Sequence, residues 1–205
     1  MNNLDSLIKH FEEFPGVGGR QARRFAFHVL TLEKANTEEL ANLIINLQGS
    51  VIECFSCHRF FSRNGGNATE CTICSDVNRD RTKLMVVERD SDIIAIERSN
   101  VYDGLYFVLG GTIPLLSSKE TKGLRGGALK AIIDTRTTQE LSEIILAFAV
   151  NPDGENTSRY VESLLKEQIT THNLKLTQLG RGLSTGSELE YADPETIKNA
   201  LIHRS

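Results

Sequence analysis

The N-terminal part of the chain has the spacing of amphipathic helices, with apolar residues three and four positions apart. Two such stretches, 4–11 and 22–30, flank the sequence Phe14-Pro15-Gly16-Val17-Gly18, which predicts a tight turn. The apolar positions are Leu4, Leu7, Ile8 and Phe11 in the first stretch and Ala22, Phe25, Ala26, Val29 and Leu30 in the second. The pattern therefore predicts a helical hairpin.

A third helix is expected to begin at Thr37, whose hydroxyl suits an N-cap and which is followed by Glu38 and Glu39 in the first turn. Its apolar positions are Leu40, Leu43, Ile44 and Leu47. We expect these side chains to extend the small core of the hairpin.

Beyond Arg81 the pattern changes to short apolar runs separated by helical stretches. Strands are predicted at 84–87, 105–109, 144–150 and 175–179, and helices at 91–98, around 160–169 and after Asp193. The glycines at 123–127 predict a turn. Strands that alternate with helices predict a mostly parallel sheet covered on both sides. The predicted fold class is α/β, and mixed α+β overall because of the N-terminal helices.

Composition places the chain among ordinary globular proteins. Of its 205 residues, 40% are hydrophobic and 24% are charged, which argues against disorder and allows one large or two modest domains. No apolar run approaches the roughly 18 residues of a membrane span, and the N-terminus lacks the basic and apolar regions of a signal peptide. We therefore expect a cytoplasmic protein with no membrane segment, in a compartment where disulfides are rare.

All four cysteines lie in one segment as two Cys-x-x-Cys pairs, Cys54 with Cys57 and Cys71 with Cys74. Four thiolates at this spacing supply the ligands of a closed, tetrahedral zinc site. The alternatives are two disulfides or a redox pair, which a reducing compartment disfavours. Because no ligand position is left open, we expect one structural Zn ion per chain. We expect His58 to be exposed rather than to replace a ligand.

The hairpin turn has the apolar-Pro-Gly-apolar-Gly pattern of helix-hairpin-helix DNA-binding motifs. Gly16 and Gly18 let the backbone approach a phosphate closely, and free N–H groups at the start of the second helix can bind it. Arg20 and Arg24 lie one turn apart opposite the apolar stripe, and Arg23 adds a charge beside them. The alternative is a solvated basic face, because short glycine turns between helices are common.

The overall charge of the chain does not favour DNA. The formal net charge is −4, so a DNA-binding function requires a local concentration of basic residues, which the hairpin has. Contacts of this kind are made to phosphates. They predict binding that is sensitive to salt and largely independent of DNA sequence.

Carboxylates follow two of the predicted strands. Glu88 and Asp92 come after the strand at 84–87, and Asp153 and Glu155 come after the strand at 144–150. Binding sites of parallel sheets form at the carboxyl ends of the strands, and carboxylates there could hold Mg²⁺. The alternative is that acidic residues are common in any exposed loop or helix start.

Features of an enzyme are missing from the sequence. The later strand is not followed by the Asp-x-Asp that would complete a two-metal clamp on a phosphate. The chain also has no lysine-bearing phosphate loop, and no Ser/His/Asp or Cys/His set can be assigned. We therefore expect no catalytic residue, and we expect any Mg ion to have no catalytic role.

In this order the parts resemble the RecR family of bacterial recombination mediators over essentially the whole chain. The resemblance rests on the hairpin, the cysteine pairs, Val86-Val87-Glu88 and the pattern R-G-L-x-x-G-x-x-L-E-Y-A-D at 181–193. Further matching pieces are Asp76-x-x-Arg79-Asp80, Ala95-Ile96-Glu97-Arg98 and Val108-Leu109-Gly110-Gly111.

The resemblance implies four parts. These are a helix-hairpin-helix DNA-binding region at 1–52, a four-cysteine zinc finger at 53–77, a Toprim α/β domain at 78–175 and a C-terminal interaction region at 176–205. It implies a non-enzymatic role in recombinational DNA repair, in which the protein helps to load RecA on single-stranded gaps together with RecO and RecF.

The resemblance also implies a homo-oligomer, either a dimer or a ring-like tetramer that can encircle DNA. Its hairpin contacts to DNA map onto Arg20 and Arg24. We expect the N-terminal helices and the region Gly182–Asp193 to form the contacts between copies. The carboxylates Glu88, Asp92, Asp153 and Glu155 are then expected to bind a basic partner such as RecO.

The chain departs from the family pattern after Ala147. The usual Thr-Asn-Pro-Thr is replaced by Phe148-Ala149-Val150-Asn151, and the usual Glu-Gly-Glu by Asp153-Gly154-Glu155. The segment 117–122 diverges too. The rival functions are a Toprim-type metal-dependent nuclease or primase-like enzyme, and a zinc-ribbon transcription factor, which would leave the α/β domain unexplained.

Overall fold

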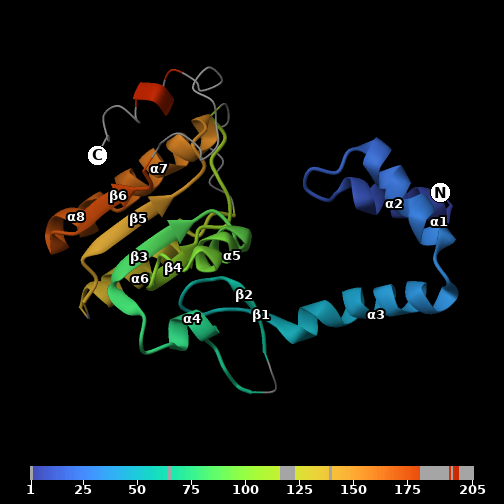
Figure 1. The fold of residues 1–205 in the computed structure, drawn as a ribbon, viewed down its shortest axis with the longest axis horizontal. Helices are drawn as coiled ribbons and strands as arrows, with labels where there is room; N and C mark the ends of the chain where they lie inside the picture. The colour runs from blue at the N-terminus through green and yellow to red at the C-terminus, as the bar shows by residue number, and fades with distance from the viewer. Residues whose placement is uncertain are drawn as a thin grey trace. The chain divides into compact units, whose positions relative to one another are not determined.

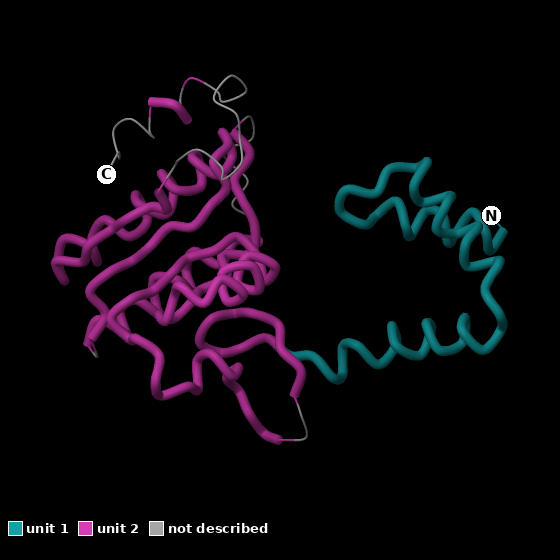
Figure 2. The backbone as a smooth tube through the Cα atoms, in the orientation of Figure 1, with its two compact units in different colours: residues 1–52 teal, residues 53–205 magenta. Residues whose placement is uncertain are grey.

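The computed structural model describes residues 2–63, 66–115, 123–138, 140–180, 194 and 196–198. The chain forms two compact units, residues 1–52 and residues 53–205 (Figure 2). Among the described residues, no helix is both long enough and apolar enough to cross a membrane. The finer division of the second unit at residues 77 and 175 stays a prediction.

The first unit contains the predicted helical hairpin. Helix α1 (Asn3–Glu12) begins at the cap residue Asn2, whose side-chain oxygen accepts a hydrogen bond from the Asp5 N–H at 2.8 Å. Helix α2 (Gly19–Thr31) packs against α1 through two fully buried alanines, Ala22 and Ala26. Small side chains at these positions let the two helices approach closely.

Helix α3 (Lys34–Ser50) differs from the prediction in two ways. It begins before Thr37, with Glu33 as its cap residue, and none of its residues is buried. The side chains predicted to extend the N-terminal core are exposed by 40% at Leu40, 63% at Leu43, 63% at Ile44 and 58% at Leu47. That prediction is wrong for the single chain, because helical spacing reveals an apolar face but not what covers it.

The second unit is built on a parallel sheet. Its strands are β3 (Asp80–Val87), β4 (Gly104–Val108), β5 (Glu143–Ala147) and β6 (Lys175–Gln178), in the order β4-β3-β5-β6 (Figure 1). Val87 lies opposite both Val108 and Ala147, so these three strands end at a common edge. The predicted parallel α/β arrangement is confirmed.

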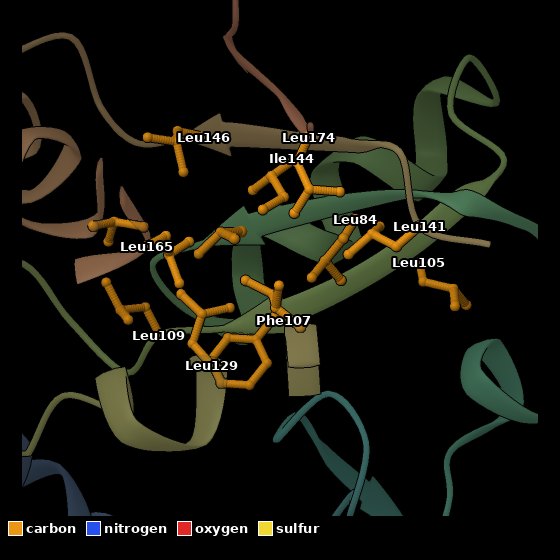
Figure 3. Close-up of a cluster of buried hydrophobic side chains, with 13 residues drawn as sticks. Leu84, Leu105, Phe107, Leu109, Leu129, Leu141, Ile144, Leu146, Leu165 and Leu174 are labelled. Carbon is orange, nitrogen blue, oxygen red and sulfur yellow. The ribbon is translucent and has the colours of Figure 1, made fainter. Parts of the chain in front are cut away.

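Both faces of the sheet are covered, because side chains of β3 alternate between them. Leu84 and Val86 face one core, to which Leu129 contributes from α6 (Gly126–Thr137) and Val161 from α7 (Pro152–Leu164) (Figure 3). Met85 and Val87 face a second core, which contains Ile93 of α5 (Asp90–Ser99) and the four cysteines. The cysteine segment therefore forms part of the cover of the sheet.

Strand β5 ends earlier than predicted. The apolar run continues to Val150, but the strand stops at Ala147 because Asn151 caps the following helix. Its side-chain oxygen accepts a hydrogen bond from the Gly154 N–H at 2.8 Å. A Cβ on Gly154 would lie 2.0 Å from the Ala149 carbonyl oxygen, so only glycine fits this turn.

Several short elements were not predicted. Helix α6 begins inside the segment predicted as a turn, and the helical stretch after Pro152 consists of α7 and α8 (Lys166–His172). Around the cysteines lie β1 (Val51–Glu53), β2 (Phe60–Ser62) and α4 (Thr72–Ser75). The predicted contact region Gly182–Asp193 and most of the last helix lie outside the described residues.

Candidate metal centre and nucleic-acid interface

The four cysteines come together although fourteen positions separate Cys57 from Cys71. All four are free and buried, and their sulfur atoms lie within 4.8 Å of one another. The Sγ atoms of Cys57 and Cys71 are 3.6 Å apart, which is too far for a disulfide. Tetrahedral Zn–S bonds of about 2.3 Å would place the sulfurs about 3.8 Å apart, so the donor set fits that geometry.

We call residues 54–58 the metal knuckle. Two backbone hydrogen bonds shape it, from the Cys54 N–H to the Arg59 carbonyl at 2.8 Å and from the His58 N–H to the Cys54 carbonyl at 2.9 Å. The Cys71 N–H donates to the Cys54 Sγ at 3.3 Å. Donors aimed at sulfur favour the thiolate form that binds metal.

Electrostatics of the cluster also favour a cation. Hydrogen bonds from Cys57, Cys71 and Cys74 lower the pKa of the Cys54 thiol, although burial opposes its ionisation. The neighbouring thiols and burial raise the pKa of Cys57 and Cys74, so four thiolates can share this buried space only around a positive charge. The cysteines are the only group of His, Cys, Asp or Glu in the described part of the chain arranged closely enough to hold a metal ion.

His58 is not freely exposed, contrary to the prediction. Its Nδ1–H donates a short hydrogen bond to Glu53, and its ring packs edge-on against Phe107 with centroids 5.2 Å apart. Glu53 also pairs with Arg125 at 3.3 Å. Burial opposes the charged form of Glu53, but the hydrogen bond from His58 and the charge of Arg125 outweigh it, so the pKa of Glu53 is lowered.

The knuckle is attached to the sheet at its β4 edge. The Val108 N–H donates to the Cys57 carbonyl at 2.8 Å, while the next N–H, that of Leu109, donates to Val87 of β3 at 2.9 Å. Successive N–H groups of a strand point to opposite sides, so the knuckle binds the side of β4 that faces away from β3.

The hairpin turn has a geometry that suits a phosphate. Gly16 has φ +77°, a conformation that favours glycine, and a Cβ on Gly16 or Gly18 would meet nothing within 4 Å. Gly18 precedes α2, and no side chain caps the start of that helix. The N–H groups of Gly19 and Arg20 therefore lie at an uncapped, electropositive helix terminus.

The predicted basic residues lie on the exposed surface of this hairpin. Arg20, Arg23 and Arg24 are exposed residues of α2, and none of them forms an ion pair with a carboxylate among the described residues. Sequence reasoning missed Glu12, whose carboxylate oxygen would lie 2.8 Å from a Cβ on Gly19. This negative charge stands beside the helix terminus and opposes the approach of an anion.

The acidic residues after β3 are engaged within the chain. Glu88 pairs with the guanidinium of Arg89, and its side chain is only 14% exposed. Asp92 accepts a hydrogen bond from the Arg89 N–H at 2.9 Å and so caps α5. Both side chains are held by their neighbours, which is the role that acidic residues at a helix start commonly have.

The acidic residues after β5 are also bound. Asp153 accepts a hydrogen bond from the Leu115 N–H at 2.9 Å, and Thr157 accepts one from the Ile113 N–H at 2.8 Å. These contacts attach the segment after β4 to the start of α7. Glu155 lies 3.9 Å from Arg159. In the described part of the chain, no three of these carboxylates converge as ligands for Mg²⁺.

An ion pair that the sequence did not predict links the cysteine segment to α5. Arg79 donates to Glu97 at 2.9 Å, and the Tyr106 hydroxyl donates to the same carboxylate at 2.7 Å. The only sequence signal for the pair was its place in two of the matching family pieces, 76–80 and 95–98. Its geometry indicates a structural role.

Comparisons with known proteins agree along the chain. Family models described as "RecR, helix-hairpin-helix", "Toprim domain" and "RecR, C-terminal" match residues 4–47, 82–178 and 182–205. The Recombination protein RecR of Staphylococcus aureus is 35% identical to this chain in strains JH9, JH1 and MRSA252. Each alignment covers 98% of this chain and 96% of the relative.

Proposed function

Because this chain belongs to the RecR family of recombination proteins, we propose that it is a non-enzymatic, DNA-binding mediator of recombinational repair. In this role it helps to load RecA on single-stranded gaps, together with RecO and RecF. A protein that acts on chromosomal DNA works in the cytoplasm of a bacterium. The four-cysteine centre then holds one Zn ion with a structural role.

The observation that carries the proposal is the N-terminal hairpin. An open glycine turn, an uncapped helix start and three exposed arginines are adjacent in one small unit. Backbone N–H groups at a helix start bind phosphate, and the arginines add charge-assisted hydrogen bonds. Such contacts read the DNA backbone rather than the bases, which suits a protein that must act at any gap.

A salt titration of DNA binding tests the proposal. Arg20→Ala/Arg24→Ala should weaken binding equally on unrelated DNA sequences and flatten the log–log salt slope by about 0.7–0.9 for each phosphate that is no longer neutralised. The matched control is Lys34→Ala/Lys166→Ala, which removes the same charge from exposed positions elsewhere. Glu12→Gln should strengthen binding. An unchanged affinity and slope in the arginine variant, with the fold intact, would place the DNA surface elsewhere.

The rival enzymatic function has less support. Glu88 is paired with Arg89, Asp92 caps a helix and Asp153 holds a backbone N–H, so these carboxylates are occupied by contacts within the chain. A two-metal phosphoryl-transfer site needs carboxylates that converge on the ions. DNA cleavage or synthesis with Mg²⁺ or Mn²⁺ that disappears in Glu88→Gln would favour the enzyme.

Self-association is supported by the uncovered apolar face of α3. Leu40, Leu43, Ile44 and Leu47 are exposed on one side of a helix in the unit that carries the hairpin. Exposed apolar faces of this kind mark protein interfaces. We propose that a second copy of the chain covers them. Several hairpins in one assembly would hold DNA more tightly than one, because linked sites gain effective concentration.

The sequence predicted that RecO docks on Glu88, Asp92, Asp153 and Glu155, and we now propose that only two of these four carboxylates contact it. Asp92 and Asp153 accept backbone hydrogen bonds, so we assign the proposed contact with a basic partner to Glu88 and Glu155, which are held by arginine side chains rather than by backbone N–H groups. Both form ion pairs with neighbouring arginines, so a partner would compete with Arg89 and Arg159. Binding should therefore weaken as salt rises.

A further inference from the structure

The backbone of His58 has a left-handed conformation, which is uncommon for residues other than glycine although histidine adopts it more often than most. Its φ is +61°, and the only other non-glycine residues with positive φ in the described part of the chain are Asn100 and Asn173. Those two asparagines end α5 and α8, where a left-handed residue is common. His58 ends no helix, and glycine would adopt this conformation at lower cost. Such a backbone conformation persists only where surrounding contacts hold it, which points to a role for the His58 side chain.

The side chain of His58 begins a bridge. It donates to Glu53, its ring contacts Phe107, and Glu53 in turn forms an ion pair with the Arg125 Nε at 3.3 Å. The His58 side chain is only 21% exposed, so the first link of this bridge is partly shielded from water. Hydrogen bonds to an ionised carboxylate are stronger in such surroundings.

Arg125 carries the bridge to the turn after β4. Its Nη1 donates to the Val108 carbonyl at 3.3 Å, and its N–H donates to the Leu109 carbonyl at 2.9 Å. A Cβ on Gly110 would lie 2.9 Å from Arg125 Nη1, so glycine lets the guanidinium lie against the turn. The Gly110 N–H donates to the Glu88 carbonyl at 2.9 Å, at the carboxyl edge of the sheet.

We propose that His58 is a positioning residue that, through Glu53 and Arg125, locks the metal knuckle against the glycine turn after β4. The metal site and the carboxyl edge of the sheet are thereby held in one arrangement. This role goes beyond DNA binding and does not depend on it. It explains why histidine stands where glycine would relieve the strain.

Amide hydrogen exchange in the zinc-loaded, full-length protein tests the bridge. His58→Gly removes the side chain while its φ of +61° remains favourable, so the backbone has no reason to unfold. We expect the Gly110 amide to exchange about tenfold faster or more, because local opening becomes easier, with zinc content unchanged at one ion per chain. The matched control is Asn100→Gly, which makes the same kind of change at a helix end outside the bridge.

Glu53→Ala cuts the bridge without altering the knuckle and should give the same result. The double variant His58→Gly/Glu53→Ala should exchange no faster than the faster single variant, because both changes remove one connection. The proposal fails if Gly110 exchange is unchanged in both single variants, or if their effects on the exchange free energy add. Neither measurement involves DNA, so the result can be interpreted even if the proposed DNA-binding function is wrong.

Discussion

Substitutions of Gly16 and Gly18 in the hairpin turn distinguish the effect of backbone strain on stability from the effect of an added side chain on DNA binding. A Cβ on either would meet nothing within 4 Å, but Gly16 has φ +77° and Gly18 has φ −86°. Gly16→Ala should therefore cost roughly 1–2 kcal/mol from the left-handed conformation alone. Gly18→Ala is unstrained, and the roughly 0.4–1 kcal/mol gained by restricting the unfolded chain is offset by the poorer N-cap that alanine makes, so stability should stay close to that of the parent.

Hydrogen exchange at the buried residues Ala22 and Ala26 measures the stability of the first unit. A local measurement is needed because a chain of two units need not unfold in one transition. A loss of one or two kcal/mol in Gly16→Ala corresponds to roughly 5- to 30-fold faster exchange. Equal exchange in the two variants would refute the argument from backbone conformation.

The effects of the same two substitutions on DNA affinity should differ from their effects on stability. Gly18→Ala adds a methyl group at the start of α2, where the phosphate is proposed to lie, so affinity should fall while stability is kept. Fluorescence anisotropy with labelled single-stranded DNA at several salt concentrations measures this. Parental affinity in Gly18→Ala at every salt concentration would mean that no phosphate approaches this terminus.

The metal centre, the partly buried ion pair between Arg79 and Glu97, and helix α3 each provide a further test. Cys57→Ser should lose zinc by elemental analysis and lower the melting temperature sharply, because structural zinc can contribute about 10 kcal/mol of apparent binding energy; a folded, metal-free protein with paired cysteines would contradict this. Burial opposes ionisation of Glu97, but the hydrogen bonds from Arg79 and Tyr106 outweigh it and lower the pKa of Glu97 below 4.5. The ionised Glu97 therefore stabilises the folded protein above pH 4.5, and this contribution is lost as the pH falls through the lowered pKa. Acid titration of Glu97→Gln should therefore show a smaller loss of stability below pH 4.5 than the parent. Ile44→Glu should reduce the mass measured by sedimentation, whereas Asn42→Glu, on the opposite side of the same helix, should not, and a monomeric parent would refute the interface.

The sequence predicted the elements that periodicity and spacing determine. Leu84 to Val87 read as a buried strand because apolar residues face both cores, and two Cys-x-x-Cys pairs located the metal centre. Helix α6 was missed because its start, Arg125 to Gly127, has the composition of a turn. Its place is set by contacts of Arg125 with the strand end, which no local pattern reveals.

Residues at the candidate sites show the same limit. The sequence grouped the carboxylates by their position after strands, yet it could not show that Asp153 binds the distant Leu115 N–H. It placed His58 in solvent because the partners of that side chain, Glu53 and Phe107, are fixed only by the fold. It assigned α3 to the hairpin core because the spacing of apolar residues shows that a helix has an apolar face but not which surface packs against that face.

The bond between the Cys57 carbonyl and the Val108 N–H has a consequence for the fate of the protein when metal is scarce. Strand β4 is the outermost strand of its sheet, and its sequence, Gly-Leu-Tyr-Phe-Val, is uncharged and rich in strand-forming residues. Bare edges of this kind template pairing with other chains and seed amyloid-like aggregates. The Cys57 carbonyl therefore covers part of this edge, and if loss of the proposed zinc ion released it, β4 would be open to pairing with other chains, which aggregation after treatment with a chelator would reveal.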